Sequence, residues 1–157
     1  MIVWKKTHGM QAAIVIAVLL AGASASWAQG FGPRFGLTSD PDQVHMGLHL
    51  PTLRMTPHLG FMASFEAGVG DDTTLFSGNF DFKYVFSAHA GTWHPYMGGG
   101  PALHLADHDQ FDDQMEVGLG IIGGMQTVTK GGGFFAEMRI GVVDSPDLKF
   151  TVGWMFR

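Results

Sequence analysis

Histidine and serine side chains are the residues of this sequence that could take part in metal binding or catalysis. His104 and His108 flank Asp107 and Asp109, and imidazole and carboxylate groups are common ligands of divalent metals. Their spacing matches no closed ligand set, so a solvated polar loop is the simpler interpretation. The acidic segments also lack the Asp-x-Asp-x-Asp-Gly pattern of a calcium loop. We therefore predict no metal and no other cofactor.

Nucleophilic catalysis by serine needs a histidine base and an orienting acid. Ser87 and His89 are close in sequence but fall in an expected turn, and Ser64 and Ser77 have no evident histidine partner. Gly98–Gly100 is not followed by Lys-Ser/Thr and lies in an expected strand, so it is no phosphate-binding loop. The sequence therefore predicts that the protein is not an enzyme.

Charged side chains are scarce, at 15% of the residues, and nine of them alternate with apolar residues. Five are cations and four are carboxylates, a near balance that suits an enclosed space where charges must pair. We predict that they form one internal charge network, centred on Glu137, Arg139 and Lys149. Loss of Arg139 is expected to leave Glu137 underpaired and to cost ~3–5 kcal/mol of stability. The nine residues are Arg34, Arg54, Glu66, Asp81, Lys83, Glu116, Glu137, Arg139 and Lys149.

The segments that carry these charges have the period-two alternation of β-strands with two unlike faces. The C-terminal segment is the clearest. Large apolar residues occupy its even positions from Leu148 to Phe156, and its odd positions are small, polar or charged apart from Met155. Seven further segments precede it, and none has a helical pattern. The expected strands cover residues 31–38, 44–50, 53–69, 76–86, 93–105, 115–126, 134–142 and 148–157.

The expected turns lie at residues 39–42, 70–73, 87–92, 130–133 and 144–147, with an acidic loop at 106–114. Pro51 is expected to end the second strand and Pro57 to bend the third. An even number of strands in hairpin order favours an all-β fold, namely an eight-stranded antiparallel up-and-down transmembrane β-barrel. A β-sandwich is the alternative fold.

Two features predict that the apolar face points outward. The lumen of an eight-stranded barrel barely holds its own side chains, and the many phenylalanines of residues 76–86 would not fit inside it. The other face is rich in glycine and has too few charges for a surface that meets water. The apolar face carries no charge, as a lipid-facing surface requires, because a cation at the bilayer midplane would cost ~2–4 kcal/mol.

Aromatic and acidic residues separate to opposite ends of the expected barrel. The aromatic girdle comprises Tyr84, Phe86, Trp93, Trp154 and Phe156, all at one end. The turns at the other end hold nearly all the turn aspartates, from Asp40 and Asp42 to Asp144 and Asp147. If the N-terminus is periplasmic, the girdle marks the periplasmic side.

The first 28 residues have the pattern of a signal peptide, which we expect to be cleaved after Ala28. Lys5 and Lys6 precede a short apolar run, and Ser26-Trp27-Ala28 closes it. A retained membrane anchor is the alternative. The barrel then spans residues 29–157, has no cysteine, and keeps seven Lys and Arg residues against fourteen Asp and Glu. Such an acidic chain is a poor nucleic-acid binder.

Three short motifs carry a resemblance over residues 31–157. They are Asp40-Pro41-Asp42-Gln43, Pro95-Tyr96-Met97-Gly98-Gly99-Gly100 and the terminal Gly153-Trp154-Met155-Phe156. The chain resembles the small outer-membrane β-barrel proteins of Gram-negative bacteria, the OmpA-like and OmpX-like, porin-like single-domain barrels. Family C-termini usually end on the aromatic residue that the assembly machinery reads, whereas here Arg157 follows it.

The resemblance implies export through the periplasm to the outer membrane of a Gram-negative bacterium. The implied partners are outer-membrane lipid, lipopolysaccharide and, through the C-terminal strand, the barrel-assembly machinery; a monomer is expected. The implied role is structural, surface-interacting or of minor permeability. Two alternatives remain open: a membrane-embedded enzyme that modifies lipid A, and a soluble periplasmic ligand-binding barrel.

Overall fold

The computed structural model describes residues 30–156 apart from 41, 71–72, 109–110 and 128, so the expected signal peptide and Arg157 lie outside the described residues. No helix long and apolar enough to span a membrane occurs among the residues described. The described residues form nine strands. These are β1 (Gly32–Ser39), β2 (Gln43–His49), β3 (Leu53–Arg54), β4 (Leu59–Gly70), β5 (Thr73–Val85), β6 (Trp93–His108), β7 (Phe111–Thr127), β8 (Gly132–Val143) and β9 (Leu148–Phe156).

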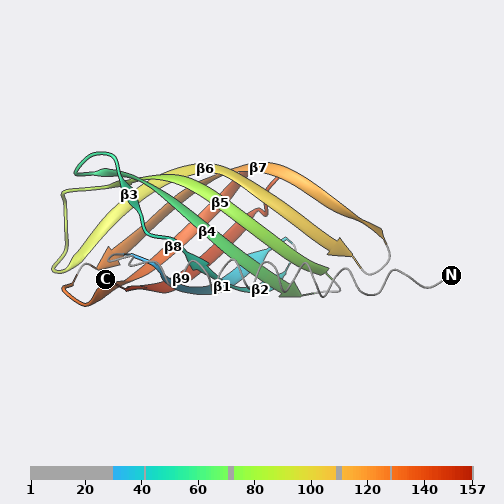
Figure 1. The fold of residues 1–157 in the computed structure, drawn as a ribbon, viewed down its shortest axis with the longest axis horizontal. Coiled ribbons are helices and arrows are strands. Elements are labelled where there is room, and N and C mark those ends of the chain that lie inside the picture. Colours follow the sequence, from blue (N-terminus) through green and yellow to red (C-terminus); the bar gives the residue numbers. More distant parts are fainter. Residues whose placement is uncertain (1–29, 41, 71–72, 109–110, 128, 157) are drawn as a thin grey trace.

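Antiparallel pairing joins these strands into a closed barrel (Figure 1). Neighbours follow the order β2-β1-β9-β8-β7-β6-β5-β4, and β2 pairs with β4 to close the circle. The two-residue β3 extends β2 along the same edge of β4. The predicted all-β, eight-stranded antiparallel barrel is therefore confirmed, because closure leaves no long sheet edge unpaired.

The predicted third strand was wrong in its first part. Leu53 and Arg54 pair with Phe61 and Gly60, so they prolong the second barrel strand. The backbone N–H groups of Met55 and Thr56 both donate to the carbonyl of Leu59, at 2.9 and 3.0 Å, and the chain reverses there. Pro57 lies inside this turn, where a missing N–H breaks no ladder bond. Pro51 interrupts the second barrel strand but does not end it.

The acidic loop predicted at residues 106–114 is shorter in the structure. Ala106 pairs with Gln114 and His108 with Phe111, with an irregularity in register between Ala106 and His108. Residues 109–110, which include Asp109, lie outside the described residues. Backbone pairing prevails over the polar composition, because each N–H and C=O needs a partner whatever side chain it carries.

Two of the turns predicted from aspartate-rich composition contain a left-handed residue. Asp40 has φ 52° and Asp144 has φ 40°. Aspartate tolerates this region better than most residues, since its short side chain hydrogen-bonds locally. Both turns lie at the end of the barrel opposite the C-terminus.

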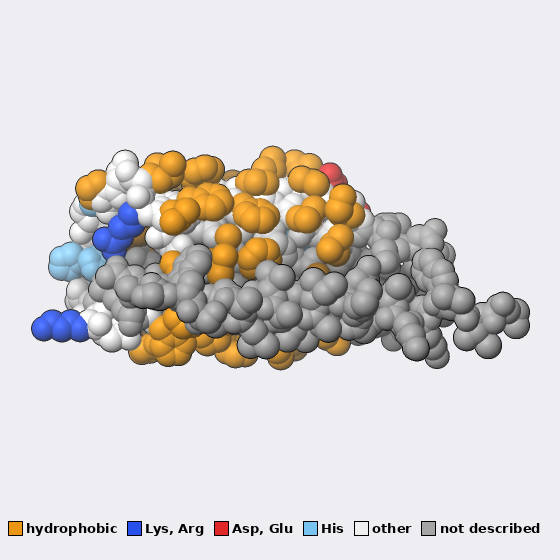
Figure 2. Space-filling view, in the orientation of Figure 1, with side chains coloured by type: hydrophobic (Ala, Val, Ile, Leu, Met, Phe, Trp, Pro, Cys, Tyr) orange, Lys and Arg blue, Asp and Glu red, His pale blue; other side chains and the backbone are white. Residues whose placement is uncertain are grey.

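Side chains of the barrel wall follow the predicted division into two faces. The outer face is a belt of large apolar residues contributed by every long strand, including Phe35 (51% exposed), Ile121 (53%) and Phe150 (51%). Figure 2 shows apolar side chains gathered on one side of the barrel. The inner face is mainly polar, with Glu66, Lys149 and others at most 6% exposed. A soluble barrel or sandwich buries its apolar face, so this arrangement is that of a barrel surrounded by lipid.

Candidate functional site

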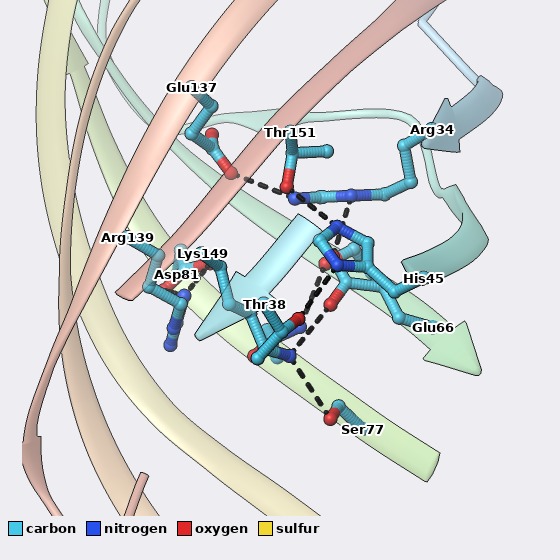
Figure 3. A network of polar contacts seen from close by, with 12 residues as sticks. Arg34, Thr38, His45, Glu66, Ser77, Asp81, Glu137, Arg139, Lys149 and Thr151 are labelled. Atoms are coloured by element: carbon cyan, nitrogen blue, oxygen red, sulfur yellow. Dashed lines mark hydrogen bonds and ion pairs between the residues drawn. The ribbon is translucent and has the colours of Figure 1, made fainter. Parts of the chain in front are cut away.

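Glu66 of β4 links two cations from other strands inside the barrel (Figure 3). Its Oε1 lies 2.8 Å from Nε of Arg34 on β1. Its Oε2 accepts a hydrogen bond from Nζ of Lys149 on β9, at 2.9 Å. All three side chains are buried. In the barrel order, β1 and β2 lie between β9 and β4, so the Lys149–Glu66 pair crosses the lumen.

Glu137 of β8 holds the other end of the Arg34 guanidinium. Nη2 of Arg34 donates to Oε1 of Glu137 at 2.8 Å, and the Tyr96 hydroxyl on β6 donates to Oε2 at 2.9 Å. Both oxygens of Glu137 therefore have a donor. Tyr96 was not predicted as a site residue, although it shares the strand phase of Gly98 and Gly100, and the glycine-rich face was predicted to lie inside the barrel.

Arg139 pairs with Asp81 of β5, and not with Glu137 as predicted. Its Nη1 donates to both carboxylate oxygens of Asp81, at 2.8 and 2.9 Å, and its Nη2 donates to the Gly100 carbonyl at 3.3 Å. Residues two apart on one strand point the same way but are spaced along the lumen, so a long side chain finds its partner across the barrel. The pair of Arg139 and Asp81 joins β8 to β5, with β7 and β6 between them.

Seven of the nine predicted charges are buried inside the barrel, and two are not. Arg54 belongs to an exposed stretch, residues 53–58, which projects beyond one end of the wall. Glu116 lies in β7 where residues 115–117 are all exposed, so that part of the β6–β7 hairpin has solvent on both faces. The strand phase of both residues is correct, but each lies past the rim, where phase no longer selects an interior. We call the six ion-paired residues Arg34, Glu66, Asp81, Glu137, Arg139 and Lys149 the central network.

Lys83 of β5 is the seventh buried charge, and it is arranged differently. Its side chain is 4% exposed, yet no carboxylate of the described residues lies within ion-pair distance. Its Nζ lies 3.6 Å from the centroid of the Tyr96 ring, a cation–π contact. Lys83 therefore does not join the charge network as predicted.

Two buried histidines of β2, His45 and His49, lie inside the barrel in different surroundings. His45 lies between the Oγ1 atoms of Thr38 (2.8 Å) and Thr151 (3.0 Å). His49 packs edge-on against Phe135, with ring centroids 5.2 Å apart. His45 therefore links β2 to β1 and β9, and no carboxylate is bonded to either imidazole among the described contacts.

Ser77 does have a histidine partner, contrary to the sequence prediction. Its Oγ lies 3.0 Å from Nδ1 of His104, and Nε2 of His104 lies 3.2 Å from Oγ of Ser145. Lys149 donates to the same Ser77 oxygen at 3.2 Å. The link was missed because β5 and β6 pair residue 77 with residue 104, a register that spacing does not reveal. No cluster of three metal-ligating side chains occurs among the described residues; the side chains of Asp107 and His108 are outside them.

The five predicted girdle residues lie at one end of the barrel, where β5 and β9 end and β6 begins; we call this the girdle end. Four of them are exposed to between 37% and 44%, and Trp93 is half-buried. Their rings contact other aromatic rings. The ring centroids of Tyr84 and Phe86 lie 5.3 Å apart, and those of Trp93 and Phe134 lie 5.9 Å apart. The turn aspartates Asp40, Asp42, Asp144 and Asp147 are exposed at the opposite end.

Comparisons with known proteins relate the chain to solved barrels by fold. No family model matches it, and no curated protein matches it. The crystal structure of Neisserial surface protein A (NspA) superimposes with a TM-score of 0.62 at 18% identity, covering 82% of this chain and 94% of that one. The N-terminal β-barrel domain of Pseudomonas aeruginosa OprF gives 0.60 at 16% identity, covering 82% and 93%. Together with the closed barrel and its apolar exterior, these matches show that the chain has the fold of the small eight-stranded outer-membrane β-barrels.

Proposed function

We propose that this protein is an integral outer-membrane barrel of a Gram-negative bacterium whose role is structural, with a lumen closed to bulk solutes. The observation that carries the proposal is the central network. Its four ion pairs, each 2.8–2.9 Å long, join strands that are not neighbours in the wall. Such pairs occupy the lumen, and eight strands leave little space beside them.

The outer surface supports the membrane location. The apolar belt would be costly in water over so large an area, and the belt ends in aromatic residues that suit a bilayer interface. Under this proposal the girdle end faces the periplasm, and the aspartate turns face outward toward lipopolysaccharide and its divalent cations. The proposal includes removal of residues 1–28, monomeric insertion, and recognition of β9 by the barrel-assembly machinery.

Membrane fractionation followed by gels of unheated and heated samples tests the location. The protein is expected in the outer-membrane fraction, with a mobility shift only after heating, because a closed barrel resists cold SDS. Mass spectrometry of that material should find Gln29 at the N-terminus. Recovery in the soluble periplasmic fraction would refute the proposal.

Planar-bilayer recording tests the closed lumen. The purified barrel should give no steady conductance, whereas the double variant Asp81→Ala/Arg139→Ala should conduct more, because it removes one cross-lumen pair. A stable open conductance of the unmodified protein would assign it a permeability role.

A lipid-modifying enzyme is the second candidate, and the chain of Ser145, His104 and Ser77 is the observation that favours it. The direction of the hydrogen bonds in this chain argues against catalysis. Lys149 can only donate to Ser77, and the one acceptor that the described contacts offer the Ser77 hydroxyl is Nδ1 of His104. His104 then carries its proton on Nε2 and donates to Ser145. It therefore cannot accept the hydroxyl proton of Ser145, as the base of a catalytic serine must.

Release of fatty acid from purified lipopolysaccharide decides between the two candidates. We expect no release by the unmodified barrel, and none that depends on Ser145. Hydrolysis that is lost in Ser145→Ala but kept in the matched variant Ser87→Ala, whose serine lies at the girdle end, would establish the enzyme.

A further inference from the structure

A cavity lined by both polar and apolar groups opens at the girdle end of the barrel, separate from the central network. Its volume is about 510 Å³, within the range of sites for small molecules. Arg54, His58, Lys83 and His94 line it, together with hydroxyl and amide groups such as that of Gln126. No Asp or Glu side chain is among the described residues that line it. The cavity therefore offers hydrogen-bond donors and positive charge.

Lys83 is a buried charged residue that lines this cavity. The central network accounts for the other buried charges: both oxygens of Glu137 are held by Arg34 and Tyr96, and both oxygens of Asp81 by Arg139. Four cations and three carboxylates are buried among the described residues, and Lys83 is the cation left over. Tyr96 covers one side of its ammonium group, and the cavity lies beside it.

A buried ammonium without a counter-ion is costly, and a bound anion removes that cost. We propose that the girdle-end cavity binds a small solute through an oxyanion, a carboxylate or a phosphate group, which pairs with Lys83 at the inner wall. Arg54, which is exposed, and the half-buried His94 also line the cavity and contact the outer part of the anion. Pro57, Phe86 and Met155 add apolar surface for the remainder of the solute. The girdle end thus has a ligand site even though the central network closes the lumen.

NMR of the lysine side chains tests this directly in the full-length barrel, folded in zwitterionic detergent and labelled on lysine. Inorganic phosphate and acetate are titrated separately, each against sodium chloride at matched ionic strength. Either oxyanion is expected to shift the Lys83 signal saturably, while Lys130, exposed at the same end, follows ionic strength alone. The arm that saturates at lower concentration identifies the preferred group. Equal, unsaturable shifts of Lys83 and Lys130 in both arms would overturn the proposal.

Calorimetric titration of variants gives an independent measurement. Lys83→Met should weaken binding at least tenfold, which is the loss expected for a hydrogen bond to a charged group. Lys130→Met, the matched control, should leave affinity unchanged, and Arg54→Ala should weaken it by a smaller factor. Heat-shifted gel mobility confirms that each variant is folded. Binding that survives Lys83→Met would place the anion elsewhere and refute the site.

Discussion

Two buried lysines of this barrel show how position within one lumen changes the same side chain. Lys149 is 3% exposed and donates to Glu66 and Ser77. Lys83 is 4% exposed and contacts the face of an aromatic ring. Burial alone therefore does not tell whether a charge holds the structure together. In the middle of the lumen, carboxylates from other strands pair with the buried cations and stabilise the barrel. At the girdle end, the buried charge of Lys83 has no ion-pair partner among the described residues and lines a cavity.

The largest effect should come from Glu66, because it serves two cations at once. Glu66→Gln leaves Arg34 and Lys149 with one charged partner fewer in an enclosed space, and should cost ~5 kcal/mol, the upper end for a broken buried ion pair. Urea unfolding of the barrel in lipid vesicles measures this cost. Glu116→Gln is the matched control on an exposed residue and should change stability by less than ~0.5 kcal/mol. Similar unfolding midpoints for the two variants would remove the distinction between middle and rim.

Arg139 should come next, with Asp81 as the group it leaves behind. Arg139→Ala is expected to cost ~3 kcal/mol. Because the two side chains form one pair, Asp81→Ala/Arg139→Ala should cost less than the sum of the single variants. Additive costs in a double-mutant cycle of urea midpoints would show that the pair is not coupled. A strong coupling in a second cycle, made with Arg139→Ala and Glu137→Ala, would restore the partner expected from the sequence.

A cation on the outer face should be costly in proportion to its depth in the bilayer. Ile121, 53% exposed on β7, is expected near the middle of the belt, so Ile121→Lys should cost ~2–4 kcal/mol. Leu53, 65% exposed at the girdle end, is the control, and Leu53→Lys should cost at most ~1 kcal/mol. Both values come from reversible unfolding in vesicles. Equal small costs would mean that lipid does not surround this face.

The smallest effect, and the one of opposite sign, should come from Lys83. Replacement by methionine removes an unpaired buried charge and keeps the volume, so Lys83→Met should leave stability unchanged or raise it by up to ~1 kcal/mol. Lys149→Met should lower it by several times that amount, because it leaves Glu66 short of a partner. Parallel urea titrations in anion-free buffer compare the two. A large loss of stability in Lys83→Met would mean that Lys83 belongs to the central network.

Much of the barrel could be predicted from the sequence because its alternation is strong. The main parts of the strands from β4 onward, and the positions of both aspartate turns, followed from local patterns. The errors occurred where the chain passes the rim. The turn at residues 55–58 and the pairing of residues 106–114 depend on how long neighbouring strands are, and that length is decided by pairing across the sheet.

The interior residues could be selected by strand phase, but their partners could not. Phase places Arg34, Glu66 and Lys149 on one face, and it also places Arg54 and Glu116 there, although both lie beyond the wall. Ser77 and His104, 27 residues apart, meet because of the β5–β6 register. Spacing along the chain contains no signal for such a meeting.

The sequence by itself determined which face of each strand meets lipid and which meets the lumen, since period two is a local property of the backbone and the residue types differ sharply between the faces. Only the tertiary structure decided which charged side chains pair with one another. Closure of the barrel brings Lys149 to Glu66, 83 residues away, and Arg139 to Asp81, 58 residues away. The same closure leaves Lys83 beside a cavity, because strand tilt and register set which side chains share a level of the lumen.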